Sequence, residues 1–305
     1  MKDRYFFSSV TRISDMSECD FILQNLPRDQ WETGDYTAGK VITTVGCQCN
    51  VELPNGRMTE VSDSDVVIGV FGHREATLEA VGDWHAIDDN YRFELMTAAG
   101  LFGKITSCSI FRPTPLSLDY QGHVLRNGNK VKMSDFVGVY GDRAFNLPVV
   151  LLIGTSMSAG KTTAGKIITR QLKKAGYNVI GAKLTGAARY RDSLAFADAG
   201  ADHIFDFVDM GLPSTVCDPE DYRKRLCNLL SRMAEIKADV LVAEIGASPL
   251  EPYNGSIAIE ELEKYVRCTV LCASDPYAVV GVSSAFNRKP DLVSGAAANT
   301  SAAIA

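Results

Sequence analysis

One stretch of the chain has residue types and a spacing suited to binding phosphate. It is rich in glycine and small polar residues and ends in Gly160-Lys161-Thr162-Thr163. An apolar run at residues 149–153 precedes it and a helix-length segment follows, which is the setting that a phosphate-binding loop requires. In such a loop the backbone N–H groups bind a phosphate chain, the lysine adds positive charge, and the threonine hydroxyl coordinates Mg²⁺. We therefore expect a cofactor site made of Gly154, Thr155, Ser156, Ser158, Ala159, Gly160, Lys161, Thr162 and Thr163.

The first glycine of this loop departs from the usual pattern, in which four residues separate it from the Gly-Lys pair. Gly154 stands one residue earlier, and Thr155 occupies the standard position. The alternative interpretation is a glycine-rich turn between a strand and a helix that binds no ligand. Because the Gly-Lys-Thr-Thr segment and both flanking elements fit, we favour the phosphate site.

Two charged residues follow buried strand candidates later in the chain. Lys183 comes after residues 179–182, and Glu244 follows the apolar residues 240–243. Ligands of open α/β sheets bind at the carboxyl ends of the strands, where Lys183 could hold a substrate carboxylate or stabilise a transferring phosphoryl group. An acid at the place of Glu244 usually lies near Mg²⁺. The alternatives are a surface lysine and a strand-end carboxylate that faces solvent.

Arg189, Arg191 and Asp192 begin a predicted helix just after Lys183. An arginine here could clamp a carboxylate or phosphate with two parallel hydrogen bonds, and Asp192 could be a second acid near the metal. An ordinary charged first turn, in which the helix dipole favours aspartate, explains the same residues equally well. We predict Lys161, Lys183, Arg189 and Arg191 as catalytic residues, and Thr162, Glu244 and Asp192 as metal ligands.

Other reactive residue types give weaker signals. Cys47 and Cys49 form a C-x-C pair without a second pair at zinc-ligand spacing, so buried thiols are favoured over a metal site. The four histidines show no metal-ligand spacing, and nothing raises His73 or His85 above a structural role. Residues 287–291, Asn-Arg-Lys-Pro-Asp, miss the guanine-reading motif by one position, which leaves ATP and GTP both open.

The elements that must position these residues follow a regular order after residue 146, because strand candidates alternate with helix-length segments. This order is typical of a doubly wound, mostly parallel α/β sheet, and we assign residues 146–305 to it. The predicted strands are residues 149–153, 179–182, 240–243, 270–273 and 292–293, and the predicted helices include residues 161–174 and 219–237.

Residues 1–145 have a different texture, with short strand candidates separated by turn residues. Pro54-Asn55-Gly56 and Asn127-Gly128-Asn129 are typical of hairpin turns. We expect a smaller β-rich domain, a barrel or a sandwich, with a boundary near residue 145. Its predicted strands include residues 40–51, 66–71 and 105–111.

Composition argues against several classes of protein. Lys and Arg number 31 against 37 Asp and Glu in 305 residues, a net charge of −6, which argues against binding of a nucleic-acid backbone. The longest strictly apolar run, residues 149–153, is far too short to span a bilayer, and the first ten residues lack the layout of a signal peptide. Eight scattered cysteines suit reduced thiols, which favours a cytoplasmic protein. Together with the charge and the short apolar runs, this leads us to expect neither a membrane nor a nucleic acid as a partner.

The six-residue spacing from Gly154 to Gly160 resembles the loop of dethiobiotin synthetase, and residues 176–186 resemble the second strand of that enzyme, which ends in a substrate-facing lysine, here Lys183. Residues 148–305 resemble the C-terminal P-loop domain of the family called domain of unknown function 1611; the resemblance does not extend to residues 1–145. It implies a P-loop NTPase fold. Some members of that family are described as D-glutamate N-acetyltransferases, so it does not imply a single reaction. The matching segments are RYRDSLAFADAGADHIFDFVDMGLPST at residues 189–215, SDPYAVVG at 274–281 and KPDLVSGAAANTSA at 289–302.

We expect an enzyme that uses ATP and Mg²⁺ to act on a small anionic metabolite, by phosphoryl transfer or ligase-type activation. One alternative keeps the fold and binds coenzyme A for N-acyl transfer to an amino acid. Another is a regulatory GTPase or metallochaperone-type switch with a protein partner. We also expect a homo-oligomer. The small-residue segment after Gly295 ends abruptly, and if the last helix is truncated, a neighbouring molecule would have to cover the sheet in its place.

Overall fold

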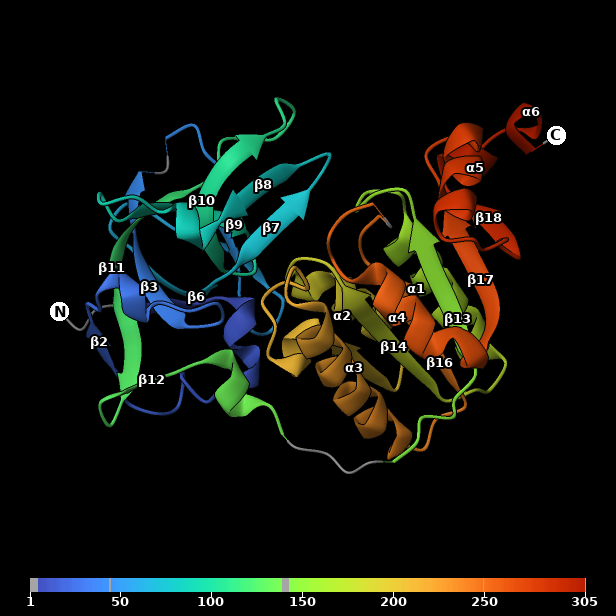
Figure 1. Cartoon of the computed structure of the whole chain (residues 1–305), viewed down its shortest axis with the longest axis horizontal. Helices are drawn as coiled ribbons and strands as arrows, with labels where there is room; N and C mark the ends of the chain where they lie inside the picture. The colour runs from blue at the N-terminus through green and yellow to red at the C-terminus, as the bar shows by residue number, and fades with distance from the viewer. Residues whose placement is uncertain (1–4, 44, 139–142, 249, 305) are drawn as a thin grey trace. The chain divides into compact units, whose positions relative to one another are not determined.

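The computed structural model of the chain describes residues 5–43, 45–138, 143–248 and 250–304, and it divides into two compact units (Figure 1). The first unit comprises Met1–Gly138 together with two short segments from later in the chain, Ala187–Tyr190 and Gly211–Ser214. The second unit comprises Val139–Gly186, Arg191–Met210 and Thr215–Ala305. Each unit has its own sheet, so the chain is a mixed α/β protein with a largely antiparallel part and an all-parallel part.

Strand pairing in the first unit closes a ring. β6 (Val66–Phe71), β3 (Tyr36–Thr43), β11 (Ser117–Arg126), β9 (Arg92–Thr97) and β10 (Leu101–Cys108) pair in that order, each antiparallel to the next. β10 then returns to β6, where Leu101 pairs with Val70 in a parallel register. The pairing forms a closed structure of strands, in agreement with the β-rich prediction for this half of the chain.

Shorter elements extend this ring. β8 (Ala80–Asp83) continues from β10 and forms a hairpin with β7 (His73–Ala76), which pairs His73 with Asp83 at its open end. The remaining strands and 3₁₀ turns are β1 (Tyr5–Phe7) beside β6, β2 (Ile22–Gln24) and β12 (Asn129–Lys130) beside β11, the hairpin of β4 (Asn50–Glu52) and β5 (Met58–Glu60), η1 (Ser9–Ile13), η2 (Arg28–Gln30), η3 (Trp84–Ala86) and η4 (Met133–Phe136).

Both predicted hairpin turns are confirmed. Residues 54–56 lie between β4 and β5, and Asn127 (φ 50°) and Gly128 (φ 80°) connect β11 to β12. Two successive positive φ angles match the right-handed twist of the flanking strands. The single strand predicted for residues 40–51 is wrong, because the chain turns at Gly46 (φ 73°) and separates β3 from β4; residue 44 lies outside the described residues.

Aromatic rings fill the core of the first unit. Phe71 stacks between Trp31 and Trp84, with ring centroids 4.8 Å and 5.7 Å away. At Gly69 on β6, a Cβ atom would lie 2.5 Å from the ring of Phe102 on β10. A side chain at this position would push the two strands apart, so the closure of the sheet requires glycine here.

The second unit is built on a parallel sheet of six strands. Their order is β15 (His203–Asp206), β14 (Val179–Thr185), β16 (Val240–Ile245), β13 (Val149–Gly154), β17 (Val266–Cys272) and β18 (Leu292–Ser294). The helices and 3₁₀ turns of this half of the chain are α1 (Lys161–Lys174), α2 (Tyr190–Asp198), η5 (Phe207–Met210), α3 (Pro219–Ala234), α4 (Gly255–Leu262), η6 (Glu263–Tyr265), α5 (Pro276–Ala285), η7 (Ala296–Ala298) and α6 (Ser301–Ile304). Strands that alternate with helices agree with the predicted α/β class.

Sequence patterns locate most of these elements. The helix predicted for residues 161–174 has the bounds of α1, and the chain turns after it at Gly176 (φ 88°). All five predicted strands exist, and each is longer than predicted, β14 and β17 the most. The sequence does not predict β15, because its four residues, His-Ile-Phe-Asp, are too few to show a period.

Two glycines set the distance between α1 and the sheet. Gly165 on α1 and Gly181 on β14 both contact Phe196 of α2, and a Cβ atom at Gly165 would lie 2.7 Å from that ring. The fully buried phenylalanine fills the space that the two missing side chains leave. This packing fixes the position of α1 relative to β14, the strand that follows it.

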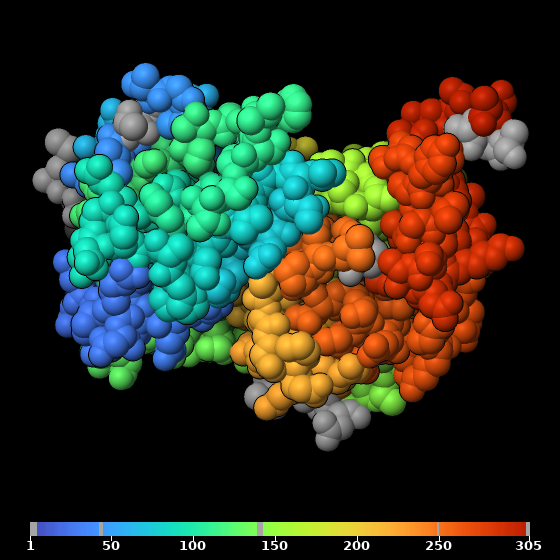
Figure 2. All heavy atoms as spheres, turned by 45° about the horizontal axis from the view of Figure 1, so that its top comes forward, coloured from blue at the N-terminus to red at the C-terminus, as the bar shows by residue number. Residues whose placement is uncertain are grey.

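The C-terminal part of the second unit is less buried than the rest. α5 buries only Val282, while Tyr277 and Val280 are 88% and 69% exposed. Figure 2 shows the residues from α5 onward, in red, standing out from the second unit. The homo-oligomer that the sequence suggests stays a prediction. Within the described residues, no helix combines the length and the apolar character needed to cross a lipid bilayer.

A buried ionic group lies within the first unit. Asp35 and His123 have no exposed surface, and His123 Nε2 lies 3.2 Å from Asp35 Oδ2. Lys130 Nζ donates to the same oxygen at 2.7 Å, and Tyr120 OH lies 2.5 Å from His123 Nδ1. Burial raises the pKa of Tyr120 to about 12, so the phenol stays protonated at neutral pH. A buried carboxylate of this kind is stable only while its partners remain.

We expect Asp35→Ala to lower the free energy of unfolding by about 3–5 kcal/mol, because it leaves the buried His123 and the half-buried Lys130 without their shared carboxylate. The control is Asp119→Ala, whose carboxylate pairs with Arg92 at 3.2 Å with both side chains well exposed. An exposed pair contributes at most about 1 kcal/mol, so the control should resemble the wild type. Both tryptophans lie in the first unit, so urea titrations followed by fluorescence report on it. Equal midpoints for the two variants would contradict this role of Asp35.

Candidate functional site

Two glycines shape the loop between β13 and α1. Gly160 has φ 94° immediately before α1, a left-handed conformation that other residues rarely adopt. At Gly154 a Cβ atom would lie 2.9 Å from Cγ of Lys161, so the missing side chain makes room for the lysine stem. Thr155 N donates to Cys272 O at 3.1 Å, which ties the loop to β17. The chain therefore leaves β13, turns, and begins α1 at Lys161.

Lys161 is buried although it is a cation. Only 1% of the residue is exposed, and its Nζ donates to Ser156 O within the same loop at 2.5 Å. Burial lowers the pKa of this lysine, and the neighbouring Glu244 carboxylate opposes the shift. The ammonium group thus lies in a poorly hydrated place, where an additional anionic acceptor would strengthen its hydrogen bonding.

The next residue, Thr162, contacts an acid on an adjacent strand. Its hydroxyl lies 2.9 Å from one carboxylate oxygen of Glu244 and 3.1 Å from the other. Glu244 is 2% exposed and pairs with Leu152 across β16 and β13. Burial raises the pKa of Glu244, while Lys183 and Lys161 act in the opposite direction. A hydroxyl and a carboxylate this close together are oxygen donors of the kind that Mg²⁺ binds.

A second buried lysine pairs with Glu244 across the sheet. Lys183 of β14 is in register with Glu244 of β16, and its Nζ donates to Asp192 Oδ2 of α2 at 2.5 Å. Burial acts to lower the pKa of Lys183, but the Asp192 and Glu244 carboxylates outweigh it and hold the pKa above its usual value. Lys183 is therefore a fixed cation at neutral pH.

Two further glycines lie against the stem of Lys183. A Cβ atom at Gly246 would lie 2.7 Å from Lys183 Cε and would collide with Thr185 O, while one at Gly186 would lie 3.4 Å from Cε. Gly246 N donates to Thr185 Oγ1 at 3.0 Å, which joins the ends of β16 and β14. Sequence reasoning misses both glycines, although each directly follows a buried strand, and that position was an available signal.

Five of the predicted site residues come together in the second unit: Lys161, Thr162, Lys183, Asp192 and Glu244. They lie near the carboxyl ends of β13, β14 and β16 or in the first turns of the helices that follow. Each of the two acids, Asp192 and Glu244, lies beside at least one of the two lysines. The group can bind an anion through its cations and a divalent ion through its oxygens.

The other predicted residues differ in exposure. In the loop, Ser156 is buried and Thr155 and Ala159 are half-buried, whereas Ser158, Gly160 and Thr163 are exposed. Arg191 is exposed in the first turn of α2, and Arg189 is exposed and belongs to the first unit. The roles predicted for the two arginines stay predictions.

Two other acids of the second unit, Asp206 and Asp291, have partners within the sheet and its turns. Asp206 accepts from Val208 N at 2.8 Å and from Ser193 Oγ at 3.0 Å, which fixes the turn after β15 against α2. Asp291 accepts from Thr269 N at 2.7 Å and so holds the residue before β18 against β17. The Asn287-to-Asp291 segment therefore has a structural role that does not depend on guanine.

Neither the known family models nor the curated proteins match this chain. The resemblances stated for residues 148–305 therefore stay expectations.

One group of reactive side chains that the sequence does not single out lies in the first unit. His73, Asp83 and His85 come from the β7–β8 hairpin and η3, and each offers a ligand atom within 4.8 Å of the others. Their signal in the sequence is the strand pairing, since a hairpin over residues 73–83 sets His73 opposite Asp83. Spacing along the chain alone does not reveal it.

We expect Gly246→Ala to destabilise the second unit by about 1–3 kcal/mol, because the new methyl group meets backbone that cannot move cheaply. The control is Gly281→Ala on α5, where no atom lies within 4 Å of the new Cβ position. Alanine is favoured over glycine within a helix, so the control should be neutral or more stable by up to about 1 kcal/mol. Denaturant titration followed by far-ultraviolet circular dichroism measures both. A Gly246→Ala variant as stable as the control would contradict the close approach of β14 and β16.

Proposed function

We propose that the second unit is a P-loop nucleotide-binding domain with a doubly wound sheet. The protein is then an ATP- and Mg²⁺-dependent enzyme that acts on a small anionic metabolite, by phosphoryl transfer or ligase-type activation. The observation that carries the proposal is the contact of Thr162, next to Lys161 at the beginning of α1, with the buried Glu244 of β16. A helix N-terminus, a cation and two oxygen ligands are what a nucleoside triphosphate with Mg²⁺ needs.

The strand order supports the doubly wound assignment. The chain passes from β13 outward to β14 and β15, returns to β16 between β13 and β14, and continues to β17 on the other side of β13. Such a reversal opens a crevice at the carboxyl ends of the strands, where open α/β sheets bind ligands. The resemblance of residues 148–305 to a P-loop family points in the same direction.

The phosphate chain would bind to the backbone N–H groups of the loop and to Lys161. The lysine Nζ donates to Ser156 O at 2.5 Å, which is a neutral acceptor. A phosphate oxygen offers a charged acceptor in its place, and charge-assisted hydrogen bonds are roughly twice as strong as neutral ones. Replacing the Ser156 carbonyl by a phosphate oxygen as the acceptor of Lys161 therefore favours phosphate binding.

Mg²⁺ would be held by Thr162 Oγ1 and an oxygen of Glu244, with water and phosphate oxygens in its other positions. When bound, the ion neutralises negative charge on the phosphates. Asp192 is already joined to Lys183 at 2.5 Å, so we assign it the role of orienting that lysine. Glu244 is the acid closest to the Thr162 hydroxyl and hence the main candidate.

Lys183 is the residue that we assign to the acceptor. It is a buried cation on the strand next to Glu244, and it is held in place by Asp192. A fixed cation near the transferring group stabilises charge that develops in the transition state and contributes less to ground-state binding. Because the cation of Lys183 favours an anionic neighbour, we propose that the substrate is an anion.

Isothermal titration calorimetry of the full chain with ATP, GTP and acetyl-coenzyme A, each with and without Mg²⁺, tests the proposal. Binding of ATP that is strengthened by Mg²⁺ supports it. Selective binding of GTP favours a switch, and Mg²⁺-independent binding of acetyl-coenzyme A favours N-acyl transfer. Binding of none of the three would overturn the phosphate site.

We expect Lys161→Met to weaken ATP–Mg²⁺ binding at least tenfold, because each lost charge-assisted hydrogen bond contributes about 1.5–3 kcal/mol. Methionine keeps the alkyl stem that lies against Gly154, so the variant should fold. Lys166→Met on the same helix is the control, because its side chain is exposed. Calorimetry on both variants decides the matter, and an unchanged affinity for Lys161→Met would exclude the P-loop assignment.

Lys183→Ala should separate binding from turnover. We expect its ATP–Mg²⁺ affinity to stay within about threefold of the wild type, while turnover with the acceptor falls about 100-fold or more, as when one transition-state donor is removed. Steady-state kinetics should therefore show a loss in kcat with little change in the KM for ATP. Wild-type turnover in this variant would remove Lys183 from the mechanism.

A further inference from the structure

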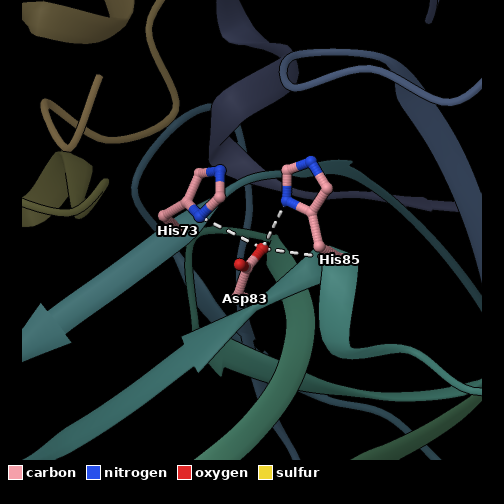
Figure 3. Close-up of side chains that lie close together, drawn as sticks. All are labelled: His73, Asp83 and His85. Atoms are coloured by element: carbon pink, nitrogen blue, oxygen red, sulfur yellow. Dashed lines mark hydrogen bonds and ion pairs between the residues drawn. The ribbon is translucent and has the colours of Figure 1, made fainter. Parts of the chain in front are cut away.

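His73, Asp83 and His85 converge on one point of the first unit (Figure 3). His73 on β7 stands directly across from Asp83 at the end of β8, and His85 follows in η3. His73 Nδ1 lies 3.1 Å from Asp83 Oδ1, and His85 Nδ1 lies 2.8 Å from the same oxygen. Figure 3 shows both rings directing a nitrogen toward the carboxylate from the same side.

The local structure holds these three side chains in place. Asp83 Oδ1 also accepts from His85 N at 2.8 Å and so caps η3, which fixes the carboxylate. The ring of His85 stacks on the ring of the buried Trp84, with centroids 3.7 Å apart. At Gly82 a Cβ atom would lie 2.6 Å from Met96 Sδ, so β8 is packed closely against its neighbours. The orientation of the cluster is therefore set by the hairpin and its packing.

We propose that His73, Asp83 and His85 form a site for a divalent transition-metal ion, with Zn²⁺ as the ion that the donors fit. This site goes beyond the proposed function and does not depend on it. Two imidazole nitrogens and one carboxylate oxygen suit zinc and similar ions, whereas Mg²⁺ prefers oxygen donors alone. The chain therefore supplies a three-ligand set of the kind that keeps further positions open.

The distances between the donor atoms agree with this assignment. Zinc bonds of about 2.0–2.2 Å at tetrahedral angles place neighbouring ligand atoms ~3.3 Å apart. The separations from Asp83 Oδ1 to the two Nδ1 atoms, 2.8 Å and 3.1 Å, differ from that spacing by only a few tenths of an ångström. The third separation, between the two ring nitrogens, lies within 4.8 Å.

A hydrogen-bond partner for the outer nitrogen of His73 is present. Thr33 Oγ1 lies 3.4 Å from His73 Nε2 and accepts from Trp84 Nε1 at 2.8 Å. With its two lone pairs the hydroxyl can also accept a hydrogen bond from Nε2–H, which leaves the lone pair of Nδ1 for a metal.

Solvent reaches the site. The side chains of His73, Asp83 and His85 are 23%, 39% and 59% exposed. Ions can therefore enter without unfolding of the hairpin, and water can occupy the positions that the protein leaves open. A structural zinc site, in contrast, is closed by four protein ligands.

The test uses the full chain freed of metal with a chelator and without nucleotide, so that no phosphate oxygen helps Thr162 and Glu244 to bind the added ion. Titration with Co²⁺, followed by visible absorption, should show saturation at one ion per chain and displacement by Zn²⁺. His73→Gln and His85→Gln should each weaken Co²⁺ binding by about 100-fold or more, since losing an outer partner alone costs about 10–100-fold. Thr33→Val should weaken it about tenfold.

Two matched controls keep the result interpretable. His203→Gln removes an exposed histidine from β15, and a Cys47→Ser/Cys49→Ser double variant removes the C-x-C thiols; both should bind Co²⁺ like the wild type. Thermal melting of each variant without metal should match the wild type, because the removed imidazoles are not core residues. Absence of stoichiometric Co²⁺ uptake by the wild type overturns the proposal. So does retained binding in both histidine variants, or loss of binding in the cysteine variant.

Discussion

The neutralisation of Glu244 is the interaction on which the centre of the second unit depends. A carboxylate with 2% exposure cannot rely on water, so its charge must be met by protein groups. Lys161 and the hydroxyl of Thr162 meet it from α1 and Lys183 meets it from β14, which fixes these two elements relative to β16. The burial of two long lysine stems has a further consequence, since a side chain at Gly154 would crowd the stem of Lys161 and one at Gly246 would crowd that of Lys183. The glycines are therefore part of the electrostatic arrangement, although they carry no charge.

The first unit contains the same kind of arrangement for a different purpose. Asp35 is fully buried, and Lys130 and His123 reach it from β12 and β11, so the ionic group joins two strands that pair with each other. The rings of Trp31 and Phe71 lie beside His123, with centroids 5.6 Å away. The lysines and the Thr162 hydroxyl around Glu244 are the groups that we propose bind phosphate and Mg²⁺, whereas around Asp35 the partners are used within the fold. Burial of charge alone therefore does not identify a binding site; the geometry of the donors next to it does.

Local rules explain how much of this could be predicted from the sequence. The hairpin at Asn127-Gly128 and the helix from Lys161 onward follow from backbone conformations that few residues adopt, so they are visible in the sequence. The placement of Lys183 and Glu244 at strand ends was visible for the same reason, because apolar runs end there. The partner of each residue was not visible: the pairing of Lys183 with Asp192, or of His73 with Asp83, arises only when separate segments meet. The prediction of one strand across residues 40–51 is wrong because the chain turns at Gly46. The alternation of residue types does not reveal a single residue with a positive φ angle.

The chemistry of the donors distinguishes the two cation sites proposed for this chain. Thr162 and Glu244 offer oxygen atoms only, in a buried place where a carboxylate already has lysine neighbours, so a weakly held hard ion that arrives with phosphate fits there. His73 and His85 offer nitrogen atoms beside one carboxylate in a solvent-accessible hairpin, which suits an ion that binds the protein directly. An ion such as Zn²⁺ gains little at the first site, because no imidazole or thiolate is among its assigned ligands, and Mg²⁺ gains little at the second, because only one of its three ligands is an oxygen. The type of ligand atom alone can thus direct two different divalent ions to two different sites of one chain. The two sites need not differ in net charge.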